Sequence, residues 1–83
     1  MGTVVKKLSE LIIGEIAQIG GYISETAESL RLQEMGLLPG TQLQITRKGA
    51  AGYPLEIQAR GYRLALRKED IELLYLIPIR IQK

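Results

Sequence analysis

The chain has 83 residues, 46% of them hydrophobic, and a formal net charge of +2 from 11 basic and 9 acidic residues. It contains neither cysteine nor histidine, which excludes disulfides, thiolate or imidazole metal sites and the commonest general base. One domain is expected over residues 1–83, with its core at about residues 8–76. The longest apolar run, residues 73–79, is far shorter than the roughly 20 residues of a membrane span. The N-terminus shows no apolar segment typical of a secretory signal, so the predicted compartment is the cytoplasm.

The first regular element in chain order is a strand predicted at residues 15–19, which the glycine pair at residues 20–21 is expected to end. A helix is then predicted at residues 24–35. Either Ser24 or Thr26 can cap its N-terminus, since a hydroxyl oxygen at that position accepts a backbone N–H bond. No other segment of the chain indicates a helix of this length.

The predicted helix is followed by two turn signals. Gly36 stands directly after the helix, where a residue in the left-handed conformation commonly ends it. Pro39 and Gly40 then favour the two central positions of a type II turn. The chain is therefore expected to reverse direction before residue 42.

Beyond that turn, apolar and polar residues alternate in residues 42–46, 55–60 and 62–67, as half-buried strands require. Residues 68–70 are predicted to form a polar turn with one turn of 3₁₀ helix, and residues 72–79 form the last strand. Five short strands, with the helix inserted between the first and the second, indicate a mainly β fold. A small barrel that closes on itself and so removes its edges is the expected architecture.

Carboxylates are the remaining side chains that can serve catalysis or bind a metal ion. Glu69 and Asp70 are adjacent and are expected to lie on a solvated turn. Glu34, Glu56 and Glu69 are weak candidates for holding Fe²⁺ or another divalent transition metal, because oxygen ligands bind such ions with little selectivity. The serines are expected at capping and turn positions. The chain is therefore predicted to be no enzyme and to hold no tightly bound cofactor.

A basic ladder is the first candidate for a binding surface. Arg60, Arg63 and Arg67 lie on the polar sides of two adjoining predicted strands, with Lys68 beside them. An exposed face kept soluble by charge would look the same. The alternative is a docking patch for an acidic partner, to which Tyr62 would add the amphipathic contact area that interfaces favour.

The end of the predicted helix is the second candidate. Met35, Leu37 and Leu38 crowd three large apolar side chains around Gly36. Some of them must enter the core. Any that remains outside is a natural hydrophobic anchor for a partner protein.

These two regions carry a resemblance to a known family. Residues 30–41, LRLQEMGLLPGT, resemble the signature of the FeoA domain, in which an Arg-bearing helix runs into an (L/M)GL-x-PG turn. Residues 54–57 and 60–67, PLEI and RGYRLALR, are similar to its second hallmark. The opening residues 8–14 also fit, so the resemblance spans about residues 8–75.

The resemblance implies an SH3-like barrel and a cytoplasmic accessory of FeoB, the membrane ferrous-iron transporter with a cytosolic GTP-binding domain. It implies docking on that cytosolic part and modulation of iron uptake, with association to the membrane only through this partner. The residues that it points to for partner contact are Leu30, Arg31, Glu34, Met35, Leu37, Leu38, Arg60, Tyr62, Arg63 and Arg67.

Alternative functions stay open at this point. The same domain occurs at the C-terminus of DtxR-type repressors, which leaves a transition-metal-binding or metal-sensing role. Nucleic-acid binding ranks last, since acidic residues interleave with the basic ones and stacking aromatics are scarce. A homo-oligomer is left open, and residues 78–83 lie beyond the pattern and have no assigned role.

Overall fold

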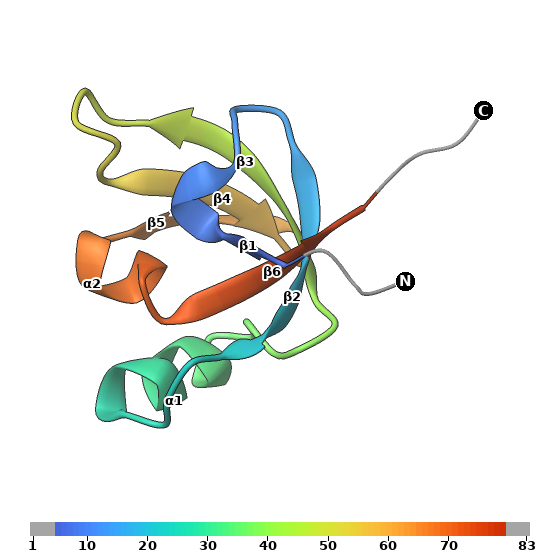
Figure 1. Cartoon of the computed structure of the whole chain (residues 1–83), viewed down its shortest axis with the longest axis vertical. Coiled ribbons are helices and arrows are strands. Elements are labelled where there is room, and N and C mark those ends of the chain that lie inside the picture. The colour runs from blue at the N-terminus through green and yellow to red at the C-terminus, as the bar shows by residue number, and fades with distance from the viewer. Residues whose placement is uncertain (1–4, 80–83) are drawn as a thin grey trace.

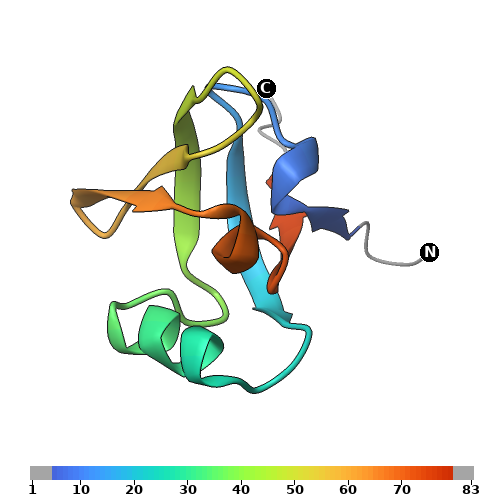
Figure 2. The ribbon, with the colours of Figure 1, turned by 90° about the vertical axis from the view of Figure 1, so that its left-hand side faces the viewer.

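The computed structural model describes residues 5–79 and consists of one antiparallel sheet with short helical segments (Figure 1). The sheet has six strands in the order β1-β6-β2-β3-β4-β5. Figure 2 shows it curling around the core, with β4 and β5 on one side and β6 and β1 on the other. The elements are β1 (Lys6–Lys7), η1 (Leu8–Glu10), β2 (Ile16–Tyr22), α1 (Ala27–Glu34), β3 (Gln42–Lys48), β4 (Leu55–Ala59), β5 (Tyr62–Leu66), α2 (Lys68–Ile71) and β6 (Leu74–Pro78).

The predicted mainly β class with one inserted helix is confirmed, with two differences. The five predicted strands correspond to β2–β6, and β1 is an additional strand of two residues that pairs with β6. The sheet is also not closed. Within residues 5–79, β1 and β5 end the strand order and no ladder joins them, so two edges remain. The polar turn predicted at residues 68–70 is the short helix α2.

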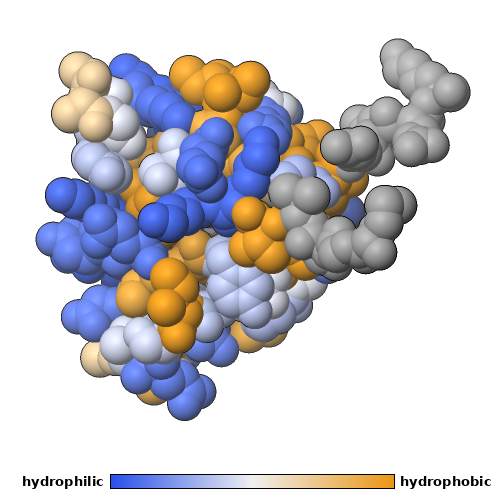
Figure 3. Space-filling view, in the orientation of Figure 1, coloured by the Kyte–Doolittle hydropathy of each residue, from blue (hydrophilic) through white to orange (hydrophobic). Residues whose placement is uncertain are grey.

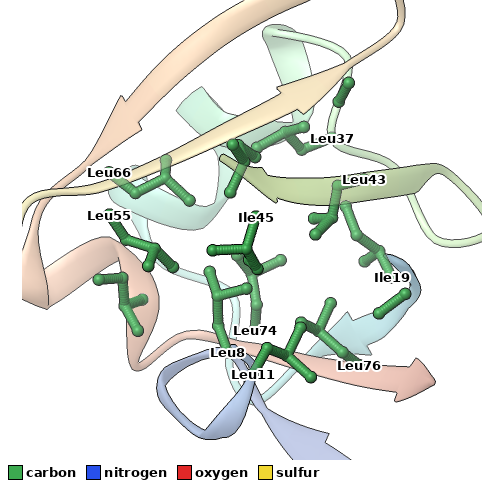
Figure 4. Close-up of a cluster of buried hydrophobic side chains, with 14 of the residues drawn as sticks. Leu8, Leu11, Ile19, Leu37, Leu43, Ile45, Leu55, Leu66, Leu74 and Leu76 are labelled. Carbon is green, nitrogen blue, oxygen red and sulfur yellow. The ribbon is translucent and has the colours of Figure 1, made fainter. Parts of the chain in front are cut away.

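The core is built by the period-two pattern of the strands. Leu43 and Ile45 of β3 are buried, and so are Leu55, Ile57 and Ala59 of β4. Each buried Leu or Ile side chain stabilises the fold by about 1.5–3 kcal/mol relative to full exposure. Figure 4 shows Leu43, Ile45 and Leu55 converging with the labelled leucines of η1 and β6. The buried apolar residues that complete the core are Leu8, Leu11, Ala17, Ile19, Leu32, Leu37, Leu66, Ile71, Leu74 and Leu76.

The glycine pair at residues 20–21 does not end the first long strand, contrary to the prediction. Strand β2 runs through both glycines, with a register shift between Ile19 and Gly21 where it pairs with β6. The ring of Tyr75 lies against this backbone. A Cβ at Gly20 would stand 2.7 Å from Cε2 of Tyr75, and one at Gly21 would stand 2.5 Å from its hydroxyl oxygen. An aromatic ring thus covers the glycines and supplies the packing that they lack.

Helix α1 begins at Ala27, three residues later than predicted, because Thr26 rather than Ser24 is its N-cap. The backbone N–H of Ser29 donates to Oγ1 of Thr26 at 3.1 Å, and the N–H of Thr26 donates to Oγ of Ser29 at 2.8 Å. This reciprocal pair satisfies two backbone donors at the helix start. It also explains why Ser29, a polar residue, is fully buried.

Hydrophobic side chains also reach the surface. Ile12 and Ile13 are 68% and 59% exposed in the loop between η1 and β2. This loop lies at the opposite end of the molecule from α1 (Figure 1), and Figure 3 shows apolar side chains gathered there among hydrophilic neighbours. No helix within residues 5–79 has the length and apolar character needed to span a membrane.

Candidate functional site

The C-terminal end of α1 sets the position of the residues that follow it. Gly36 has φ +99°, and its N–H donates to the carbonyl oxygen of Gln33 at 2.9 Å. The N–H of Leu37 donates to the carbonyl oxygen of Leu32 at 3.1 Å. These two bonds define a Schellman motif, which commonly packs the second residue beyond the C-cap against the last turn of the helix. Leu37 is accordingly fully buried with Leu32 and is removed from the set of surface contacts expected from the sequence.

The predicted type II turn follows immediately. Gly40 has φ +93°, and the N–H of Thr41 donates to the carbonyl oxygen of Leu38 at 3.0 Å. Two further backbone bonds hold the turn on β2: Gly40 N–H to Ile19 O at 2.7 Å, and Ile19 N–H to Thr41 O at 2.8 Å. These bonds fix the turn in an orientation that leaves the side chain of Leu38 on the surface, where it is 47% exposed.

The hairpin between β4 and β5 turns through Arg60 and Gly61. Their φ values of +53° and +84° match a two-residue type I′ turn, the connection that suits the twist of a hairpin. Arg60 is the one described non-glycine residue with positive φ. The turn places this side chain beside the end of α1, where a Cβ on Gly36 would stand 3.0 Å from Cδ of Arg60.

Tyr62 joins the same two segments. Its hydroxyl donates a hydrogen bond to the carbonyl oxygen of Met35 at the end of α1. The ring remains 37% exposed. The two blocks that the sequence singled out, residues 30–41 and 60–67, therefore meet in space at the C-terminal end of α1.

Asp70 is a second residue, after Leu37, that the sequence reasoning placed wrongly. It is 2% exposed rather than solvated. One carboxylate oxygen accepts from Nη2 of Arg31 at 3.0 Å, and the other accepts from the backbone N–H of Arg67 at 3.1 Å and from its Nε at 3.4 Å. The hydrogen bond to Asp70 raises the pKa of the Arg67 guanidinium above its usual value. Arg31 and Arg67 thus both bind the buried carboxylate of Asp70, and the Arg31 bond links α1 to α2.

Tyr22 supports the site from beneath. Its hydroxyl donates to the carbonyl oxygen of Leu37 at 2.6 Å, which fixes the start of the turn to β2. Burial, together with the negative charge of Asp70, raises the pKa of Tyr22 to about 12. The phenol is therefore held in its protonated, hydrogen-bonding form.

We call the exposed part of these two blocks the docking surface, after the partner contact that the family resemblance implies for them. Leu30, at 49% exposure, and Leu38 supply apolar area, as does the partly exposed ring of Tyr62. Arg60, Arg63, Arg67 and Arg31 supply positive charge, and Met35 is half-buried beneath them. A shallow hollow of about 260 Å³ adjoins Arg60, and its walls include Gln42, Gln44 and Gln58. The docking surface consists of Leu30, Arg31, Glu34, Met35, Leu38, Arg60, Tyr62, Arg63 and Arg67.

The candidate metal ligands lie on separate elements. Glu34 is on α1, Glu69 is on α2, and Glu56 of β4 accepts a hydrogen bond from Thr46 at 3.1 Å. Within residues 5–79, no three Asp, Glu, His or Cys side chains gather into a potential metal-binding group. The structure therefore does not bring the three glutamates together as a ligand set.

Comparison with known proteins finds matches to both the sequence and the fold of this chain. A family model described as the FeoA domain matches residues 6–78. An FeoA-like protein from Clostridium acetobutylicum is 25% identical, with a TM-score of 0.85, covering 100% of this chain and 95% of its own. Stenotrophomonas maltophilia FeoA, solved with zinc and described as a procaryotic SH3 domain protein, is 28% identical, with a TM-score of 0.74 and coverage of 86% and 88%. T. acidophilum IdeR, at 15% identity and a TM-score of 0.83, covers 95% of this chain over 36% of its own length and shares the fold alone.

Proposed function

Because the chain belongs to the FeoA family, we propose that it docks on the cytosolic GTP-binding part of a FeoB-type ferrous iron transporter and modulates uptake. The family and the SH3-like fold support a role in ferrous iron transport. The observation that carries the docking proposal is the convergence of two sequence-distant blocks on one surface, where Tyr62 bonds to Met35 and Arg60 lies against Gly36. Exposed tyrosine and arginine side chains are enriched at protein interfaces, and the exposed leucines add apolar contact area.

The proposal places the chain in the cytoplasm as a non-enzymatic accessory protein. For the Stenotrophomonas maltophilia protein, a role as a ferrous iron transport activating factor has been suggested. In this chain the polar groups near the docking surface serve structure: Asp70 binds two arginines, and Tyr22 binds a backbone carbonyl. These contacts support a surface that works by shape and charge.

Charge reversal on the docking surface tests the proposal. The double variant Arg60→Glu and Arg63→Glu is compared with wild type for binding to the purified cytosolic part of the transporter, by calorimetry. The matched control is Lys7→Glu with Lys48→Glu, which makes the same change in net charge near η1, where Lys48 approaches the carbonyl oxygen of Ser9 at 3.4 Å.

We expect the arginine variant to bind at least tenfold more weakly, a change of about 1.4 kcal/mol, and the control to bind within about threefold of wild type. Equal weakening by both variants would mean that net charge alone matters. Equal binding by the arginine variant and wild type would remove these arginines from the interface.

A further inference from the structure

The open edge of the sheet at β5 adjoins the docking surface, which includes Tyr62 and Arg63 of this strand. Strand β5 pairs with β4 only, and within residues 5–79 it has no partner on its other side. Its exposed residues include Arg63 and Ala65. An unpaired strand edge is a template for a further strand, because its backbone donors and acceptors point outward.

Hairpin geometry identifies which backbone groups are unpaired. A two-residue turn makes its flanking residues, Ala59 and Tyr62, a hydrogen-bonded pair, and such pairs alternate along an antiparallel ladder. With the observed register, Leu64 is the next residue bonded to β4, opposite Ile57. The N–H and C=O groups of Arg63 and Ala65 therefore point away from β4, toward the open edge.

The neighbouring ladder agrees with this assignment. Ile45 of β3 uses its backbone groups on the β2 side: its N–H donates to Glu15 O at 3.1 Å, and its C=O accepts from Gly14 N–H at 2.7 Å. Gln44, the next residue, must then face β4, where it lies opposite Gln58. Since Gln58 bonds toward β3, its partner Arg63 on β5 is the residue left facing outward.

Charge at this edge selects the kind of strand that can join it. Arg60, Arg63 and Arg67 lie at the turn, in the middle and just beyond the end of β5. Arg67 is already paired with Asp70 at 3.4 Å, and Glu56, opposite Ala65, accepts a hydrogen bond from Thr46. Within residues 5–79, Arg60 and Arg63 form no salt bridge and are the charges open to a partner. Pairing β5 with a second copy of itself would bring like charges together, whereas an acidic strand would meet guanidinium groups.

We propose that the edge of β5 binds an extended acidic segment of the partner as an added strand, held by the N–H and C=O groups of Arg63 and Ala65. The inference rests on the docking function proposed above and specifies its mode. Backbone bonds supply affinity, and the arginines select acidic side chains. The small side chain of Ala65 leaves the added strand room on the outer face.

Amide hydrogen exchange measured by NMR tests the inference in the full chain. In the free protein, we expect the amides of Arg63 and Ala65 to exchange rapidly and that of Leu64 to be protected by its bond to β4. We expect the partner's cytosolic part to slow exchange at Arg63 and Ala65 at least tenfold and to leave Leu64 nearly unchanged. Binding without this protection overturns the edge inference and leaves the docking proposal standing.

A peptide probe separates the two proposals if the transporter fragment does not bind. The probe is a ten-residue peptide that alternates Glu and Val, and its control alternates Lys and Val. Protection of Arg63 and Ala65 by the acidic peptide, and not by the basic one, supports the edge inference without the transporter. No protection by the acidic peptide overturns it.

The variant Ala65→Pro removes one outward donor, and proline is tolerated on strand edges whose N–H faces solvent. Its matched control, Ala65→Val, keeps the donor and suits a strand. We expect Ala65→Pro to weaken binding of the acidic peptide at least fivefold and Ala65→Val to bind like wild type. Equal binding by Ala65→Pro and wild type counts against the inference; the exchange measurement on wild type decides the matter if Ala65→Pro does not fold.

Discussion

The carboxylate of Asp70 determines how the two helices meet. It is buried, whereas the side chains of its partners Arg31 and Arg67 are 45% and 62% exposed. Replacing Asp70 frees both arginines to be hydrated, but it removes a charge-assisted cap from α2 and the link to α1.

Asp70→Asn keeps the shape of the side chain and removes its charge. We expect it to lower the free energy of unfolding by about 1.5–3 kcal/mol, the range for hydrogen bonds to a charged group. Urea denaturation measures this change. The neighbouring exposed variant Glu69→Gln serves as control and should change stability by less than about 0.5 kcal/mol; similar losses in both variants would refute the assigned role of Asp70.

The raised pKa of Tyr22 predicts that the stability of the fold depends on pH in the alkaline range. Its pKa rises from 10.0 to about 12 on folding, so the folded state binds the phenolic proton more tightly than the unfolded state. The resulting stabilisation is complete below pH 10 and is lost as the pH rises from 10 toward 12. Wild type should therefore lose stability over this range more steeply than Tyr22→Phe.

Thermal unfolding of both proteins at a series of pH values measures the difference. At neutral pH, Tyr22→Phe should be less stable by about 1 kcal/mol, because it loses the hydrogen bond to Leu37 O. Parallel pH profiles for the two proteins would show that the Tyr22 phenol is not held protonated by the fold.

Two residue positions show where sequence reasoning reached its limit. The burial of Leu37 had a readable signal, since a glycine directly after a helix commonly turns the following residue inward. For Asp70 the sequence signals only its local contact: an acidic residue three positions after Arg67 suits the capping of a helix start. Its bond to Arg31, 39 positions away, depends on how α1 and α2 pack and has no local trace.

At the scale of elements, alternation of apolar and polar residues was sufficient to predict strands β3, β4 and β5. It failed where strand formation depends on a distant partner. Strand β1 has only Lys6 and Lys7, which show no alternation and are strand residues because they pair with Leu76 and Tyr75. Strand β2 continues through its glycines because Tyr75 covers them.

The variant Gly20→Ala tests the role of Tyr75 in this continuation. The added methyl group would stand 2.7 Å from Cε2 of the ring, so the ring must shift. We expect a loss of about 1–3 kcal/mol of stability, typical of overpacking. In a Tyr75→Ser background the same substitution should cost clearly less, as a double-mutant cycle would show; an unchanged cost would assign the effect to the backbone of β2.

At the scale of the whole molecule, apolar side chains are exposed at both ends. Leu38 lies at the α1 end, and Ile12 lies at the opposite end, with exposures of 47% and 68%. Both positions are solvated, so Leu38→Ser and Ile12→Ser should each leave the unfolding midpoint nearly unchanged. Only Leu38→Ser should weaken binding to the transporter's cytosolic part, by about threefold to thirtyfold. Weaker binding by Ile12→Ser instead would place the interface at the other end.

The closure of the sheet is the feature of the whole molecule that the sequence did not reveal. Strand count and spacing predicted a closed barrel, but whether the first and last strands of the sheet meet depends on twist and on the elements between them. Here β5 leads into α2, and the chain then reaches β6 on the other side of the core. The resulting edge is therefore a property of the assembled fold.

The hairpin turn at Arg60 has a consequence for engineering. A left-handed backbone conformation is free of strain for glycine, is partly tolerated by asparagine and is strained for other residues. This turn nevertheless holds an arginine at φ +53°. Arg60→Gly should therefore fold at least as stably as wild type while losing affinity for the transporter. A thermostability screen would select that replacement and discard a residue of the proposed interface, so variants of this chain should be ranked by binding as well as by melting temperature.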